Sequence, residues 1–180
     1  MSKRKVLRLP LVALLATASA FALAATPIST SIPVSATVSQ ACSISTTSAL
    51  AFGAYDPIGV NVSAALNATG QISVTCSKGG TGLTVGMGQG AQPVGAQRQM
   101  KGVLLGLLSY NLFQPPSNTP AVACTFPGTI AWTDTGNGLL TLSAAPSKVA
   151  RLYNVCGTIP GGQDVTVDSY TDVVSATLNF

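Results

Sequence analysis

A long stretch near the start of the chain alternates apolar and small polar side chains. Over residues 28–44, one face carries Ile28, Thr30, Ile32, Val34, Ala36, Val38, Gln40, Cys42 and Ile44, and the other carries mainly serine and other small residues. A period of two predicts a β-strand. At about 3.3 Å per residue it would span about 55 Å, longer than the roughly 40 Å width of a domain of about 150 residues. We therefore expect part of it to overhang and to complete the sheet of another copy.

The remainder of the chain predicts a series of short strands separated by turns. The candidates are 49–52, 71–76, 83–87, 107–113, 129–132, 139–143 and 151–155, followed by 170–180. Asn137-Gly138 is the best hairpin turn, because both residues tolerate a positive φ. The chain is 47% apolar and only 8% charged, it shows no long helical periodicity, and it is rich in Val, Thr, Ser and Gly. The pattern predicts one all-β sandwich domain with antiparallel strands.

The last eleven residues repeat the alternation seen near the start. The apolar face carries Tyr170, Val174, Ala176, Leu178 and Phe180, interrupted by Asp172. A sandwich that ends on a long strand can lack the strand that belongs beside it, which leaves an open edge and an uncovered groove. The alternative is that residues 170–180 are simply the final strand of a closed sandwich.

The first residues predict a secretory signal peptide. Lys3, Arg4, Lys5 and Arg8 precede an apolar stretch at 9–23, and small residues follow at 22–24. We place this signal at residues 1–25 and expect export to the periplasm.

Removal of the leader changes the charge of the chain from +4 to about neutral. Four of the nine basic residues leave with it, so five remain against five aspartates. These five are scattered, whereas a nucleic-acid-binding surface needs clustered Lys or Arg. Nucleic acid is therefore not an expected partner.

Four cysteines in an exported chain favour two disulfides over free thiols. Cys42 and Cys76 both fall on apolar faces of predicted strands, which favours a bond between them and leaves Cys124 for Cys156, although three pairings are possible. The chain has no His and no C-x-x-C pair, so a metal site is much less favoured. We expect no metal and no cofactor.

The two alternating ends together suggest a mechanism in which the first strand of one subunit fills the groove of the next. Burial of Ile28, Ile32, Val34 and Ala36 would contribute about 5 to 10 kcal/mol gross, an upper estimate. This is comparable to the net stability of an ordinary domain. An isolated subunit should then be marginal, while a polymer should be very stable.

Several motifs, in order along the chain, resemble the spore coat protein U domain family. They are QACSI at 40–44, LAFGAYD at 50–56, ATGQISVTC at 68–76, LSYNLF at 108–113, IPGGQ at 159–163, and YTD with NF within 170–180. Despite its name, this family includes the subunits of archaic chaperone-usher pili.

The resemblance implies an incomplete immunoglobulin-like antiparallel β-sandwich, completed by a donor strand from a neighbouring subunit. Residues 26–37 would be the donor strand and residues 38–180 the sandwich. Tyr170 to Phe180 would be the strand beside the receiving groove. The implied partners are other copies or related pilins, a periplasmic chaperone and an outer-membrane usher. The implied function is a structural subunit of a cell-surface pilus that supports adhesion and biofilm formation.

Other functional classes fit the residues less well. A tip adhesin should carry a further binding domain and could lack the donor strand. The runner-up is another secreted or outer-membrane β protein, above all an outer-membrane barrel, because barrels often end in an aromatic residue on an alternating strand, as with Phe180. The 6% aromatic content and the paired cysteines argue against a barrel. An exported enzyme is the weakest hypothesis. The chain lacks both His and Glu, so general acid–base chemistry would depend on five Asp and a few Tyr and Lys. We expect no catalytic residues.

Overall fold

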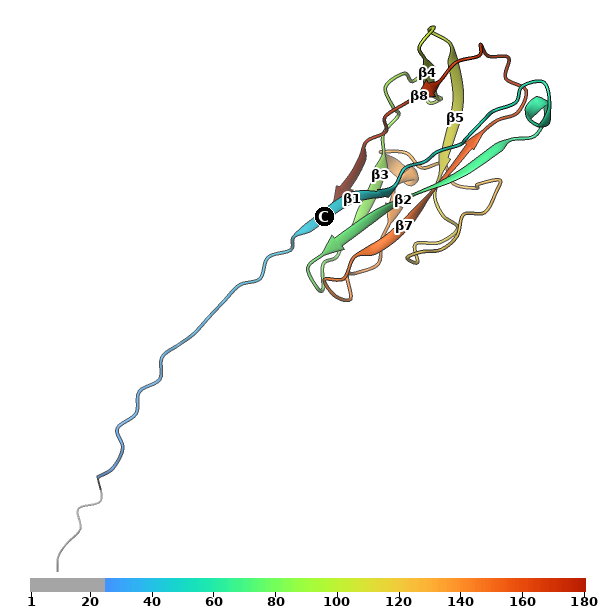
Figure 1. Ribbon diagram of the computed structural model, residues 1–180. Coiled ribbons are helices and arrows are strands. Elements are labelled where there is room, and N and C mark those ends of the chain that lie inside the picture. The colour runs from blue at the N-terminus through green and yellow to red at the C-terminus, as the bar shows by residue number, and fades with distance from the viewer. Residues whose placement is uncertain (1–24) are drawn as a thin grey trace, which may run out of the picture. The chain divides into compact units, whose positions relative to one another are not determined.

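Two antiparallel sheets pack face to face in the body of the chain, residues 37–180 (Figure 1). The structure is a computed structural model that describes residues 25–180. The strands are β1 (Cys42–Ser48), β2 (Leu66–Cys76), β3 (Thr84–Met87), β4 (Arg98–Gly102), β5 (Leu107–Phe113), β6 (Leu140–Thr141), β7 (Arg151–Ile159), β8 (Tyr170–Thr171) and β9 (Ala176–Asn179). Within the described residues, the helical segments are two 3-10 turns, η1 (Val60–Val62) and η2 (Gly136–Gly138).

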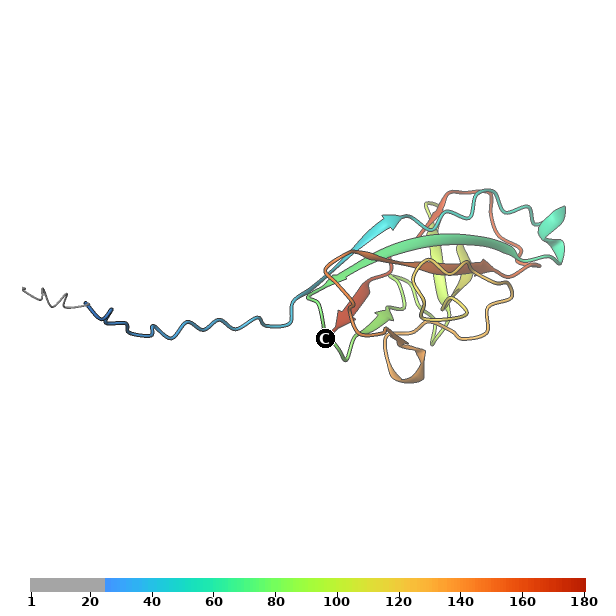
Figure 2. The ribbon, with the colours of Figure 1, turned by 90° about the horizontal axis from the view of Figure 1, so that it is seen from below.

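The larger sheet has six strands in the order β1-β2-β7-β5-β4-β8, and the smaller has three in the order β6-β3-β9. All of their ladders are antiparallel. Figures 1 and 2 show the long strands β2 and β7 side by side. The expected all-β antiparallel fold is confirmed.

The core lies between the inner faces of the two sheets. Alternate residues of β2, β5 and β7 are buried against β3 and β6, as period-two patterning dictates. Trp132 is completely buried at the centre, and its indole nitrogen donates a hydrogen bond of 2.8 Å to the carbonyl oxygen of Val85 on β3. The indole therefore fills the core and leaves no buried donor unpaired.

Two disulfides join segments that are distant in sequence. Cys42 of β1 bonds to Cys76 of β2, and Cys124, in the long loop before β6, bonds to Cys156 of β7. This is the pairing that the sequence favoured. Each closes a separation of 34 or 32 residues, which in the chain-entropy model stabilises the fold by about 4 kcal/mol.

The two long alternating stretches differ from the expected continuous strands. The strand expected at 28–44 begins only at Cys42, because a strand requires hydrogen bonds to a neighbouring backbone and residues 25–41 are not part of a ladder. The strand expected at 170–180 is interrupted: β8 pairs with β4 of the large sheet, and β9 pairs with β3 of the small sheet. The C-terminal segment thus crosses from one sheet to the other.

Three further predictions need correction. Residues 49–52 form no strand, and at 129–132 there is only an isolated bridge between Phe113 and Ala131. Asn137-Gly138 lies in the turn η2 and does not form a two-residue hairpin, because Gly136 takes the positive φ of 59° and the next strand, β6, pairs with β3. Strand β4 was not predicted, because its sequence RQMKG lacks the apolar alternation of a half-buried strand.

Candidate functional site

The seam between the two sheets is the candidate site. Strand β1 is the edge of the large sheet and bonds only to β2, and β9 is the edge of the small sheet and bonds only to β3, within the described ladders. The two edges lie near each other. Each presents one row of backbone groups that a further strand could pair with.

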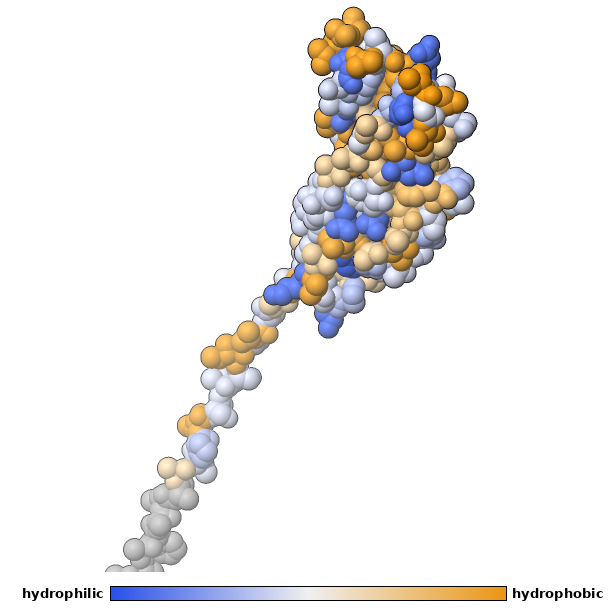
Figure 3. Space-filling model, turned by 45° about the vertical axis from the view of Figure 1, so that its right-hand side comes forward, coloured by the Kyte–Doolittle hydropathy of each residue, from blue (hydrophilic) through white to orange (hydrophobic). Residues whose placement is uncertain are grey.

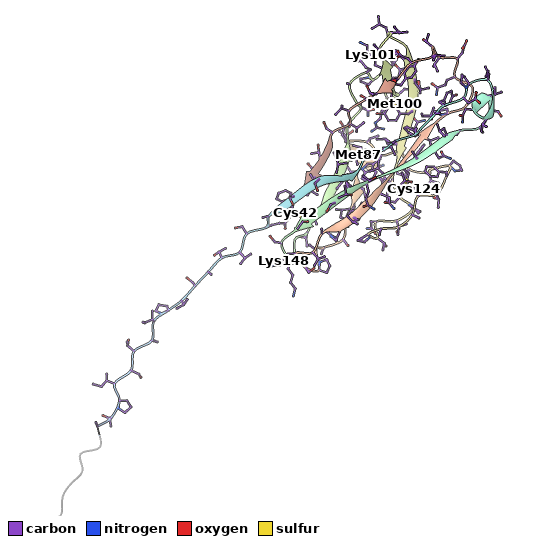
Figure 4. The ribbon with its side chains drawn as sticks, viewed as in Figure 1. Cys42, Met87, Met100, Lys101, Cys124 and Lys148 are labelled. Carbon is purple, nitrogen blue, oxygen red and sulfur yellow. A yellow bond between two sulfur atoms is a disulfide. The ribbon has the colours of Figure 1, made fainter. Side chains whose placement is uncertain are left out.

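An apolar groove follows this seam. It consists of two adjoining cavities of about 470 and 540 Å³, which share Leu50, Phe52, Met100 and Tyr170 as lining residues. The floor is formed by core side chains, among them Ile72, Met87, Leu108, Tyr110, Leu112, Val155 and Ile159. Figure 4 shows Met87 and Met100 in this part of the body. These floor side chains are buried, each at most 7% exposed, and the accessible apolar surface of the groove comes from half-buried side chains such as Leu50, Phe52 and Met100.

The first wall of the groove is the segment 49–57, which comes after β1. Leu50 and Phe52 pack over β7 at Gly157, where a Cβ atom would lie 2.6 Å from the Leu50 Cδ2 atom and 2.8 Å from the Phe52 Cζ atom. The absence of a side chain at Gly157 thus lets this wall approach the sheet. The ring of Phe52 also meets that of Tyr110 edge-on, with 6.2 Å between the centroids.

Buried polar contacts hold the end of this wall. Asn61 is 3% exposed and its Oδ1 accepts a 2.9 Å hydrogen bond from the amide of Asp56, while its Nδ2 donates to the carbonyl of Ala64. The Tyr55 hydroxyl donates to the carbonyl of Pro160 at 3.1 Å and accepts from the amide of Gln163 at 2.9 Å. Satisfied buried polar groups fix a loop that has no ladder of its own.

The second wall is the C-terminal segment 165–176. Tyr170, Val174 and Ala176 are half-buried and line the groove, whereas the odd-numbered residues between them are exposed. Leu178 is half-buried against β3, and Phe180 is 58% exposed; neither borders the two cavities. Three of the five residues predicted for the receiving edge thus lie in the groove.

Asp172 anchors the second wall at the break between β8 and β9. Its carboxylate accepts a hydrogen bond of 2.6 Å from the Tyr110 hydroxyl and one of 2.8 Å from the amide of Ala91. Burial is the main cause that raises the pKa of Tyr110 above its ordinary value. The hydrogen bond to Asp172 and the charge of that carboxylate raise the pKa further. The phenol therefore stays protonated and keeps donating to Asp172.

Arg98 of β4 is a buried cation near Tyr110 and Asp172. Its guanidinium donates to the carbonyl oxygens of Met87, Gly88 and Trp132 at 2.7 to 2.8 Å. Burial lowers the pKa of Arg98, while Tyr110, Asp134 and Asp172 act in the opposite direction. A buried cation with these carbonyl partners ties β4 to the small sheet under the groove.

The segment expected to act as donor, residues 26–37, carries no strand or helix. Ile28, Ile32 and Val34 are 100%, 80% and 91% exposed, and Thr30 and Ala36 are exposed as well. Apolar side chains at alternate positions of an extended segment are thus available for burial elsewhere. The signal peptide, apart from Ala25, lies outside the described residues.

Sequence analysis did not identify the first wall or the floor of the groove. Leu50 and Phe52, which line both cavities, were assigned to a strand. The only signal available was the alternation of Leu50 and Phe52, which does not distinguish a covered sheet from an open one. In residues 25–180, no three His, Cys, Asp or Glu side chains gather where they could hold a metal ion. That same part of the chain also has no helix of the length and apolarity needed to span a membrane.

Several known proteins are similar to this chain. The family model described as Spore Coat Protein U domain matches residues 28–177. "Protein U" of Myxococcus xanthus is 32% identical over 158 residues, which cover 81% of this chain and 80% of that protein. A chain of the CsuC-CsuE chaperone-tip adhesion subunit pre-assembly complex of archaic chaperone-usher Csu pili from Acinetobacter baumannii matches with a TM-score of 0.43 and 19% identity. That match covers 80% of this chain and 40% of the solved one, so this chain spans about two fifths of its length.

Proposed function

Because the chain belongs to the spore coat protein U domain family, we propose that it is a structural subunit of a bacterial surface pilus. Assembly would take the chaperone-usher route through donor-strand exchange, as the family resemblance implies. The subunit would be exported to the periplasm, held by a chaperone, and passed to an outer-membrane usher. The fibre would then support adhesion and biofilm formation at the cell surface.

The observation that carries this proposal is the pair of an open apolar groove and an unpaired apolar segment. The groove has a hydrophobic lining and two strand edges without a further strand beside them, β1 and β9. Ile28, Ile32 and Val34 alternate with serines and a proline, so one face of the segment is apolar and the other is small. A strand of this kind would cover the floor of the groove with its apolar face, and its backbone would form hydrogen bonds to the edge of β1 or β9.

The dimensions of the two parts agree. The second wall, residues 165–176, covers eleven residue steps, and the donor segment, residues 26–37, also covers eleven. At about 3.3 Å per step, each would be about 36 Å long if fully extended. One donor segment would therefore fill the groove of one neighbour.

Deletion of Pro27 to Ala36 tests the proposal. The shortened chain should still form a periplasmic complex with its chaperone, because the sandwich and groove are unchanged, but it should not form fibres visible by electron microscopy. A matched control replaces Ser29, Ser31 and Ser35 by alanine, which keeps the segment length and its apolar face; this variant should polymerise. Fibres formed by the deletion variant would contradict the proposal.

A further inference from the structure

One end of the body carries an exposed apolar surface that the groove does not explain. We call this end the apolar pole; its exposed apolar residues are Ile58, Val60, Val103, Leu104, Leu105 and Val167. Figure 3 shows hydrophobic side chains gathered on this end of the body. Val167 is 97% exposed and Leu104 69% exposed. A surface of this kind on three separate loops marks a contact with another molecule.

The apolar pole lies at one end of the groove. Pro57 and Val167 line the second cavity, and the amide of Leu104 donates a 2.7 Å hydrogen bond to the carboxylate of Asp168, which lines it as well. A strand that fills the groove with its final residue at this end therefore brings the next part of its own chain directly onto the apolar pole.

The connection between the donor segment and its own body is very short. The Gln40 side chain is fixed to Thr81, donating to its carbonyl at 3.0 Å and accepting from its amide at 3.1 Å. Only residues 37–39 therefore lie between Ala36 and the anchored Gln40, and the four chain steps from Ala36 to Gln40 reach about 14 Å when extended. We call the end of the body around Gln40, Thr81 and Lys78 the tether pole. It must lie close to the groove end at which a donated segment finishes.

The direction of the donated strand decides which pole it reaches. The two edges run in opposite directions: β1 starts at the tether pole, because Cys42 closely follows Gln40, and β9 runs toward that pole, because Asn179 pairs with Thr84, near Thr81. A strand placed between them is therefore antiparallel to one edge and parallel to the other. A donated strand antiparallel to β9 finishes at the apolar pole. A donated strand that runs in the opposite direction would finish at the tether pole of the recipient. It would place the donor's body where the recipient's own residues 37–39 leave the recipient's body.

The charges of the two poles are complementary. Exposed Lys78 and Lys148 lie at the tether pole, where Gly79 bonds to Ala145, and Figure 4 shows Lys148 there and Lys101 at the other end. The apolar pole carries Asp56 and Asp168 beside the cation Lys101. Contact between unlike poles sets lysines against aspartates, whereas contact between two tether poles sets lysines against lysines.

We propose that the apolar pole is the docking surface for the tether pole of the donating copy. The proposal rests on the proposed function, because it requires that residues 28–36 be donated. Successive subunits then stack tether pole to apolar pole, a heterologous contact that repeats without closing and gives a filament. The exposed apolar loops become buried at each junction.

Cysteine cross-linking between two singly substituted chains tests this arrangement. One mature chain carries Val38→Cys and the other carries Val167→Cys, and the two are assembled together and oxidised. Since each chain has one new thiol, a new disulfide must join two copies. A covalent dimer on a non-reducing gel is expected from this mixture. A matched mixture of Val38→Cys with Asn179→Cys, at the tether pole, should give none.

The outcomes separate this proposal from the function on which it rests. A dimer from the Asn179→Cys mixture, or polymers without a dimer from either mixture, would overturn the docking surface while leaving donor-strand exchange intact. Failure of the unsubstituted chain to polymerise would instead count against the proposed function, and would remove the docking proposal with it.

A fluorescent label gives an independent measurement. An environment-sensitive dye on Leu104→Cys should shift its emission to shorter wavelength when full-length subunits assemble, because the apolar pole becomes buried. The same dye on Thr119→Cys, an exposed position in the loop between β5 and β6 that does not line the groove, should not shift. An unshifted Leu104 signal in assembled fibres would show that the apolar pole remains open to solvent, and would refute the docking surface.

Discussion

Replacement of Ile32 by alanine should weaken the contact between successive subunits. The Ile32 side chain is 80% exposed in the free chain, so nearly all of its burial would be gained on insertion into a neighbour's groove. Alanine lacks three of its carbon atoms, each worth about 0.8 kcal/mol on burial, or about 2.4 kcal/mol together. A difference of this size corresponds to about fifty-fold in affinity.

The matched control is Ser31→Ala, one residue away on the opposite face of the segment. Affinity differences between related complexes are mostly differences in dissociation rate. Purified fibres of each variant would be diluted into mild denaturant, and the release of monomers measured on a gel that leaves polymers intact. Ile32→Ala fibres should dissociate up to about fifty-fold faster than unsubstituted ones, and Ser31→Ala fibres at nearly the unsubstituted rate. Equal rates for the two variants would refute the assignment of the even-numbered face to the groove.

Two further predictions concern the walls of the groove. Tyr110→Phe removes the 2.6 Å hydrogen bond to the Asp172 carboxylate and should lower the free energy of unfolding by about 1.5 to 3 kcal/mol, measured by urea denaturation of the purified protein. Since the folded-state pKa of Tyr110 is raised, its contribution is complete below the unfolded value of about 10 and is lost as the pH rises further; an equally steep alkaline loss of stability in Tyr110→Phe would contradict this. Gly157→Ala places a Cβ atom 2.6 Å from Leu50, and should cost about 1 to 3 kcal/mol of stability and slow polymerisation by displacing the first wall. The control is Gly88→Ala, whose Cβ atom would lie 3.5 Å from its nearest neighbour. Similar polymerisation rates for Gly157→Ala and Gly88→Ala would show that the first wall does not shape the groove.

The sequence predicted the strands in which alternation and burial agree. Strand β5 was predicted with its observed bounds, and β2, β3 and β7 were placed within a few residues. In each, every second side chain is buried in the core, so the sequence pattern directly reports the surroundings. The disulfide between Cys42 and Cys76 was predicted by the same logic, since these residues pair directly across the ladder of β1 and β2, whereas Cys124 and Cys156 were the pair that remained.

Prediction failed where the local pattern does not determine the partner. Residues 28–41 alternate as well as any strand, but alternation specifies two faces and says nothing about which backbone lies alongside. Strand β4 has the opposite character: its polar sequence joins the sheet because Arg98 finds three buried carbonyl partners. The break between β8 and β9 depends on the Asp172 carboxylate, whose partners Tyr110 and Ala91 are distant in sequence.

The two walls explain why the groove stays open when unoccupied. An apolar trough in water would lower its free energy by closing, but each wall is fixed by polar contacts that closure would break. Asn61 and Tyr55 hold the first wall, and Asp172 holds the second. Loss of such buried hydrogen bonds costs about as much as burial of an apolar side chain would return. The groove can therefore be filled only by a segment of another molecule. Its two strand edges favour a segment that supplies both apolar side chains and backbone groups free to form hydrogen bonds. An extended peptide strand has both, whereas a small apolar ligand would leave the edges of β1 and β9 unpaired.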